Sequence, residues 1–100
     1  MQNLSRYAEG NFPMEGDDLL LAKIRPIIMR LAEKLEKLGP NSAKDVRLSA
    51  FAEAFSEINL HADEIETVER ESILETIYDI GEIVGFDRDS GFAEEWRGDW

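Results

Sequence analysis

The side chains best suited to chemistry in this sequence gather between His61 and Glu71. His61 is the only histidine, and a run rich in carboxylates follows it. Glu66 and Glu69 are three residues apart, so on a helix they project on the same side. Two neighbouring carboxylates can serve as an acid–base pair. Together with His61 and Arg70 they can also form a polar pocket for a small ligand or a cation.

Three interpretations of this run are open from the sequence alone. On a helical projection Glu66 and Glu69 fall on the arc that later carries Ile73, Ile77 and Ile80. In the simplest interpretation the two carboxylates lie beyond the edge of the core, where they are solvated or stabilise the positive N-terminal end of a helix. A second is a buried salt-bridge network, because inward carboxylates need partners. The candidate partners are Arg25, Arg47, Thr67 and Arg70. The third is the polar pocket around Glu66.

No sequence pattern argues for catalysis. The chain has no Glu-x-x-His motif of a di-iron bundle, no Gly-x-Ser-x-Gly turn and no glycine-rich phosphate loop. Because cysteine is absent, thiolate nucleophiles, disulfides and cysteine-ligated metals are excluded. We therefore predict no catalytic residue, no metal ligand and no cofactor.

The acidic charge is concentrated in the second part of the chain. Residues 1–62 hold 9 acidic and 8 basic residues, a net charge of −1, whereas residues 63–100 hold 13 and 3, a net charge of −10. Glu64, Glu71, Glu75 and Glu82 form one ridge on the third predicted helix. The simplest explanation is a solvated face that keeps the protein soluble. The functional alternatives are a landing surface for a basic partner and a cation site, although no calcium-loop pattern is present.

Three long amphipathic helices are predicted to position these groups. The first spans about 17–38, with Asp17 or Asp18 as its N-cap and a Gly-Pro pair after its end. Pro26 removes one backbone donor inside it, yet the apolar arc keeps its phase across the proline. We predict a kink there, with Pro26 opposite the apolar arc, and two abutting helices as the alternative.

The second predicted helix spans about 42–61, with Asn41 or Ser42 as its N-cap. The third spans about 63–84, and Gly85 with the following phenylalanine resembles a C-terminal cap with an apolar latch. Helices with one apolar face bury it by packing on one another. The sequence therefore predicts an all-α fold, a small up-down bundle of three long helices.

The two ends of the chain carry fewer structural signals. Residues 1–16 are predicted to be extended or irregular, with a helical turn or two that begins at Leu4. Residues 87–100 form an aromatic and acidic tail in which we predict a short C-terminal helix. Trp96 and Trp100 are then either packing anchors or contacts for a partner.

Composition limits the classes of protein that fit. With 100 residues, 43% of them hydrophobic, the chain is expected to form a single domain over residues 1–100. No apolar run is long enough to cross a bilayer and no secretory signal is recognisable, so a cytoplasmic protein is expected. A net charge of −11 argues against binding to nucleic acid or to an anionic membrane.

Several short motifs resemble an uncharacterised family of small acidic all-helical bacterial proteins. They are the stretch EIETVERE at 64–71, the early aromatic segment from Tyr7 to Pro13, the Gly-Phe-Asp that begins at Gly85, and the closing Arg97-x-x-Trp100. The resemblance implies a bacterial origin and a compact helical fold. It implies no activity and no cofactor, and it draws attention to Glu64, Glu66, Thr67 and Arg70.

Charge and the lack of catalytic motifs together predict a non-enzymatic interaction module. We expect it to bind a basic macromolecular partner, as immunity proteins, antitoxins and adaptors do. The candidate contact residues are Glu64, Glu71, Glu75, Glu82, Trp96 and Trp100. The alternatives are a homodimer formed through an apolar face or the tryptophan tail, and a ligand or cation pocket around Glu66.

Overall fold

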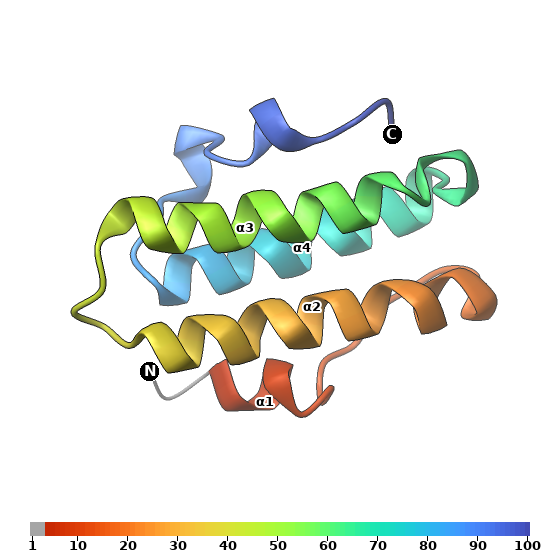
Figure 1. Ribbon diagram of the computed structural model, residues 1–100. Helices are drawn as coiled ribbons and strands as arrows, with labels where there is room; N and C mark the ends of the chain where they lie inside the picture. Colours follow the sequence, from red (N-terminus) through yellow and green to blue (C-terminus); the bar gives the residue numbers. More distant parts are fainter. Residues whose placement is uncertain (1–3) are drawn as a thin grey trace.

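Three long helices and one short helix build the part of the chain that the structure, a computed structural model, describes, residues 4–100 (Figure 1). The helices α2, α3 and α4 run up, down and up, α1 packs along α2, and the chain after α4 turns back over α3. This confirms the predicted all-α bundle. The elements are α1 (Leu4–Ala8), α2 (Asp18–Leu38), α3 (Lys44–Asn59), the 3₁₀ turn η1 (Ala62–Glu64), α4 (Thr67–Ile83), and the 3₁₀ turns η2 (Arg88–Ser90) and η3 (Glu94–Trp96).

The core lies where the apolar faces of α2, α3 and α4 meet. Phe51 and Phe55 of α3 are fully buried at its centre. The ring of Phe51 meets the edges of Phe86 and Phe92 at centroid distances of 5.8 and 5.2 Å. Such aromatic pairs add to the hydrophobic effect of burial. The other fully buried large side chains are Leu4, Leu20, Ile24, Ile28, Leu35, Ile58, Ile73, Ile77, Ile80 and Val84.

Helix α2 is continuous through Pro26, which excludes the alternative of two abutting helices. Pro26 is exposed, as the predicted position opposite the apolar arc requires, so water can satisfy the carbonyl that the proline leaves without a donor. The predicted cap is also confirmed, because Asp17 Oδ2 accepts a hydrogen bond from the Leu20 amide at 3.0 Å.

Helix α3 begins later than predicted. Its first residue is Lys44, and Ala43 occupies the N-cap position without a side-chain hydrogen bond. Ser42 is not the cap because its hydroxyl donates to the carbonyl oxygen of Gly39 at 2.8 Å. The Ser42 hydroxyl, which we predicted to cap the helix, is thus used in the preceding turn.

Helix α4 also begins later than predicted, at Thr67 rather than near residue 63. Residues 62–64 form η1, and Ile65 and Glu66 are extended. The end of α4 confirms the predicted cap: Gly85 has a φ of 96°, and the Phe86 amide reaches back to the Gly81 carbonyl at 2.8 Å. This bond belongs to a Schellman motif, in which the residue after the left-handed glycine is commonly apolar.

Two 3₁₀ turns, η2 and η3, stand where we expected a short C-terminal helix. Gly91 between them has a left-handed backbone with a φ of 62°, which interrupts any continuous helix. Phe92 nevertheless docks inward, because Gly81 has no side chain. A Cβ on Gly81 would lie 2.6 Å from the Phe92 ring.

Candidate functional site

The carboxylates of Glu66 and Glu69 form a helix cap rather than an open pocket. Glu66 is the N-cap residue of α4, and the two side chains make a capping box. The Glu66 amide donates to Glu69 Oε1 at 2.9 Å. Glu69 is 5% exposed, so it is the buried member of the pair, whereas Glu66 is exposed. The interpretation in which these acids serve the helix N-terminus fits this geometry.

Glu69 has a second task, because it also holds the segment before α2. Its Oε2 accepts a hydrogen bond from the Asp17 amide at 3.0 Å. One turn further along α4, Ser72 Oγ accepts from the Glu15 amide at 3.0 Å. These two bonds fix one side of the N-terminal strap, which we define as residues 9–17. Gly16 makes the close approach possible, because a Cβ there would lie 2.3 Å from Glu69 Oε2.

The other side of the N-terminal strap is held by Arg25 of α2. Its guanidinium donates to the Phe12 carbonyl at 2.6 Å and to the Gly10 carbonyl at 3.3 Å. The guanidinium carbon also lies 4.7 Å from the centre of the Phe12 ring, within the range of a cation–π contact. The strap is therefore fastened between α2 and α4 along its length.

The other members of the predicted polar pocket lie apart from this cap. His61 Nδ1 is 3.4 Å from Glu64 Oε2, and Glu64 Oε1 pairs with Lys23 Nζ of α2 at 2.8 Å. The hydrogen bond from Lys23 lowers the pKa of Glu64, and His61 adds to this effect. Within residues 4–100, Arg70 makes no hydrogen bond or ion pair with a carboxylate. Glu69 is thus satisfied by backbone amides, and the structure does not bring the four predicted residues together around it.

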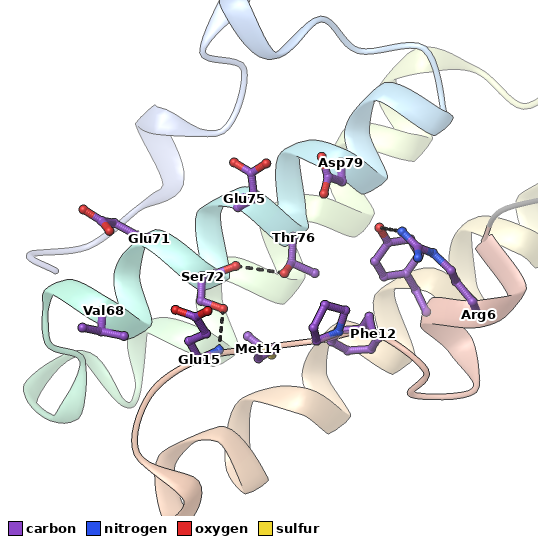
Figure 2. A pocket seen from close by; sticks show the side chains of 12 residues that line it. Arg6, Phe12, Met14, Glu15, Val68, Glu71, Ser72, Glu75, Thr76 and Asp79 are labelled. Carbon is purple, nitrogen blue, oxygen red and sulfur yellow. Dashed lines mark hydrogen bonds between the residues drawn. The ribbon is translucent and has the colours of Figure 1, made fainter.

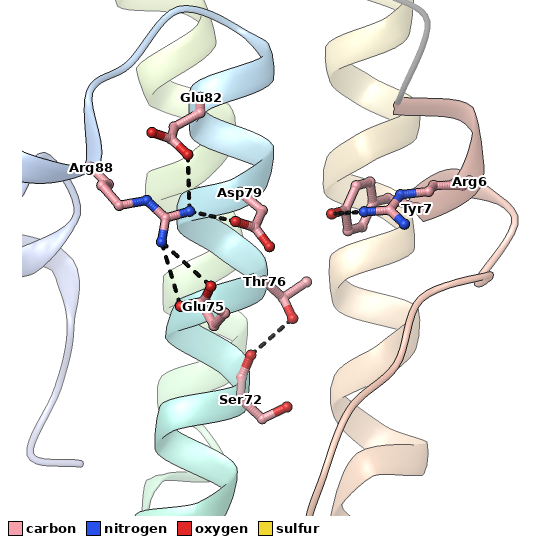
Figure 3. A network of polar contacts seen from close by, with 8 residues as sticks. All are labelled: Arg6, Tyr7, Ser72, Glu75, Thr76, Asp79, Glu82 and Arg88. Atoms are coloured by element: carbon pink, nitrogen blue, oxygen red, sulfur yellow. Dashed lines mark hydrogen bonds and ion pairs between the residues drawn. The ribbon is translucent and has the colours of Figure 1, made fainter.

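A row of carboxylates does run along α4, but part of it is neutralised. We define the carboxylate row as Glu71, Glu75, Asp79 and Glu82. Arg88 of η2 pairs with Asp79, with Glu82 at 3.0 Å and, more distantly, with Glu75 at 3.4 Å (Figure 3). The hydrogen bonds that Arg88 donates to these carboxylates, first of all to Asp79, raise the pKa of Arg88 above its usual value. Asp79 was missing from the predicted ridge, and Glu64 of that ridge lies outside α4, on η1.

The C-terminal tail, residues 87–100, is packed by its tryptophans. Trp100 is 5% exposed and stacks on Phe55 at a centroid distance of 6.1 Å, so it does not offer the exposed partner contact that we predicted. Its Nε1 donates to Asn59 Oδ1 at 2.6 Å. The Asn59 amide group in turn donates to the Trp96 carbonyl at 2.9 Å. Trp96 is half-buried, and both tryptophans act as packing anchors.

A cavity lies between the N-terminal strap and α4 (Figure 2). We refer to this cavity of about 500 Å³ as the groove. One face of α4 forms one wall, and α1 with the strap forms the other. The lining side chains are Arg6, Tyr7, Phe12, Pro13, Met14, Glu15, Val68, Glu71, Ser72, Glu75, Thr76 and Asp79.

The groove combines apolar walls with an acidic edge. Val68 is 51% exposed, and Met14 across from it is partly buried. Four carboxylates line the groove against one guanidinium, that of Arg6, which already bonds the hydroxyl of Tyr7 at 2.7 Å. A cavity of this size holds one or two side chains of a partner. Its charge favours a cation, and its walls favour an apolar group beside that cation.

Sequence reasoning found half of this groove. Glu71 and Glu75 were predicted as contacts, and the residues of the α4 wall repeat with helical spacing from Val68 to Asp79. The opposite wall was missed because the sequence of the strap has no hydrophobic periodicity that would indicate the helix it packs on. The hydrogen-bonding side chains on α4, Glu69 and Ser72, decide that position.

Within residues 4–100 no group of three or more His, Asp or Glu side chains converges in a way that could hold a metal ion. None of the helices over these residues combines the length and apolarity that crossing a bilayer requires.

Comparisons with protein-family models, with curated proteins and with solved structures gave no match. The resemblance to a family of small acidic bacterial proteins therefore stays a prediction. The groove and the carboxylate row are the features of this protein that bear on its function.

Proposed function

We propose that the protein is a non-enzymatic interaction module that binds a basic macromolecular partner through the groove. The observation that carries this proposal is that three carboxylates of α4 and apolar side chains of the strap line the same cavity. Carboxylates on a groove edge attract a cationic partner and raise its association rate. The apolar walls supply an area that is favourable to bury once the partner is bound.

The charge distribution supports the same proposal. Residues 63–100 carry a net charge of −10, and α4, which lies within this range, contributes three carboxylates to the groove edge. Among residues 4–100, Glu71 forms no hydrogen bond or ion pair with another side chain, although it is exposed beside Val68. A partner's cation can therefore pair with Glu71 without first breaking a contact of the folded protein.

The experiment is a comparison of two single charge reversals. Glu71→Lys changes the groove edge, and Glu36→Lys changes another exposed glutamate, on α2 and outside the groove. Each variant and the unchanged protein are used to capture partners from host extract at low and at raised salt, followed by mass spectrometry. We expect a stoichiometric basic protein that is lost at raised salt and with Glu71→Lys but is retained with Glu36→Lys.

Equal retention by both variants would refute the groove as the binding surface. Loss of the partner with both variants would mean that binding depends on net charge alone. We place this activity in the cytoplasm of a bacterial cell, in line with the resemblance described above. Homodimerisation also stays a prediction, and light scattering across a concentration series tests it, with a constant monomer mass as the refuting result.

A further inference from the structure

Arg88 shows how a cation sits on the carboxylate row. The guanidinium reaches carboxylates on successive turns of α4, with Nη2 paired to Asp79 and Glu82 and Nη1 3.4 and 3.5 Å from the two oxygens of Glu75. A planar guanidinium can donate to two carboxylates at once, which the compact ammonium of lysine does less well. The spacing of the row therefore suits arginine.

Two of the carboxylates that Arg88 holds also line the groove. Glu75 and Asp79 belong to the groove lining, whereas Arg88 does not. Figure 3 shows Arg88 on one side of Asp79 and the Arg6–Tyr7 pair on the other. The carboxylates of Glu75 and Asp79 therefore form a boundary that the groove and the C-terminal tail share.

The row continues past the part that Arg88 occupies. Glu71 and Glu75 are four residues apart, as Glu75 and Asp79 are, so the same spacing recurs one turn earlier on α4. Glu71 is exposed, and Arg88 contacts Glu75 only at its longest distances. Val68, one turn before Glu71, and Met14 of the strap place apolar surface beside this pair of carboxylates.

On the basis of the proposed function, we infer that the groove binds a partner segment through an arginine that bridges Glu71 and Glu75. An apolar side chain next to that arginine packs on Met14 and Val68. Arg88 is the internal competitor of the partner's arginine. The two guanidinium groups would share Glu75, and their like charges repel. Arg88 therefore weakens docking. By the reciprocity of linked equilibria, an occupied groove loosens the hold of α4 on Arg88 and the tail.

The test uses a short fluorescein-labelled peptide in which arginine alternates with leucine, titrated by fluorescence polarisation at low salt. Two comparison peptides carry lysine at each arginine or serine at each leucine. The protein variants are Arg88→Gln, its matched control Arg97→Gln, and in addition Arg88→Lys and Glu71→Gln. Arg97 lies in the same tail and its removal changes the net charge equally, but it pairs with Glu94 at 3.8 Å and not with α4.

We expect Arg88→Gln to tighten binding of the arginine–leucine peptide about three- to tenfold, and Arg97→Gln to change it less than about twofold. The comparison peptides should bind more weakly to every protein. Arg88→Lys, which keeps the charge and loses the planar fork, should lie between the unchanged protein and Arg88→Gln. A thermal melt by circular dichroism checks that each variant is folded, and Arg88→Lys carries the test if Arg88→Gln is not.

Three results would overturn this inference. Equal tightening by Arg88→Gln and Arg97→Gln would mean that only net charge matters. Unchanged binding with Arg88→Gln, together with loss of binding in Glu71→Gln, would remove the competitor role and leave the proposed function standing. No binding of any peptide to any of the proteins would remove the proposed function, and the competitor role with it.

Discussion

Glu69 is the residue whose removal most directly tests how the groove is built. Its side chain is 5% exposed and accepts two backbone amide bonds, one from Glu66 at 2.9 Å and one from Asp17 at 3.0 Å. The first bond caps α4, and the second fixes the N-terminal strap and the start of α2. Glu69→Ala removes both acceptors and leaves the start of two helices without this link.

The expected loss of stability follows from these two hydrogen bonds. A hydrogen bond to a charged group contributes about 1.5–3 kcal/mol, and loss of a helix cap costs about 0.5–2 kcal/mol. Because Glu66 and Asp17 are exposed residues, water can take over part of the bonding once the side chain is gone. We therefore expect Glu69→Ala to lower the free energy of unfolding by about 2–4 kcal/mol, a large share of the roughly 5–15 kcal/mol typical of a small domain. Glu69→Gln keeps one accepting oxygen and should cost about half as much.

The assay is urea unfolding followed by far-ultraviolet circular dichroism, with amide hydrogen exchange as a local readout. The matched control is Glu71→Ala on the same helix, which removes an exposed carboxylate and should change stability by less than about 0.5 kcal/mol. Exchange at the Asp17 and Glu66 amides should accelerate in Glu69→Ala only. A loss of stability no greater than in Glu71→Ala, or protected amides at both positions, would refute the role assigned to Glu69.

Further predictions concern the strap, the tail and the alkaline limit of stability. Gly16→Ala should destabilise by at least about 1–3 kcal/mol more than Gly39→Ala in urea unfolding, because both glycines have positive φ but only the Cβ at 16 meets another side chain. Asn59→Ala should lower the free energy of unfolding by about 1.5–4 kcal/mol, since three hydrogen bonds to the tail are lost. Because one of them comes from Trp100, tryptophan emission should shift to longer wavelength, and unchanged emission would contradict this. Burial, and then the hydrogen bond to Glu94, raises the pKa of Tyr78 above its usual 10.0. The contribution of the protonated Tyr78 to folding stability is therefore fully present below pH 10.0 and is lost as the pH rises further. Tyr78→Phe should flatten that loss in alkaline unfolding, and an equally steep loss in the variant would contradict the assignment.

The sequence predicted the helices well where local physics decides them. The apolar arc of α2, the Asp17 cap and the Gly85 cap depend on neighbours within a few residues, and all three are confirmed. The starts of α3 and α4 were misplaced because the turns before them decide where each helix begins. The Ser42 hydroxyl bonds the Gly39 carbonyl, and residues 62–64 form η1 instead of the first turn of α4.

What the sequence by itself determined is the all-α class, the apolar faces and the acidic charge of the second part of the chain, because period and composition fix them. The groove and the place of Arg88 beside it were decided only by the tertiary structure. Glu69 and Glu15 are far apart in sequence from the segments they meet, and Arg88 reaches α4 only because Gly85 turns the chain back. Long-range contacts of this kind are set by which buried faces pack together, and no local pattern encodes that pairing.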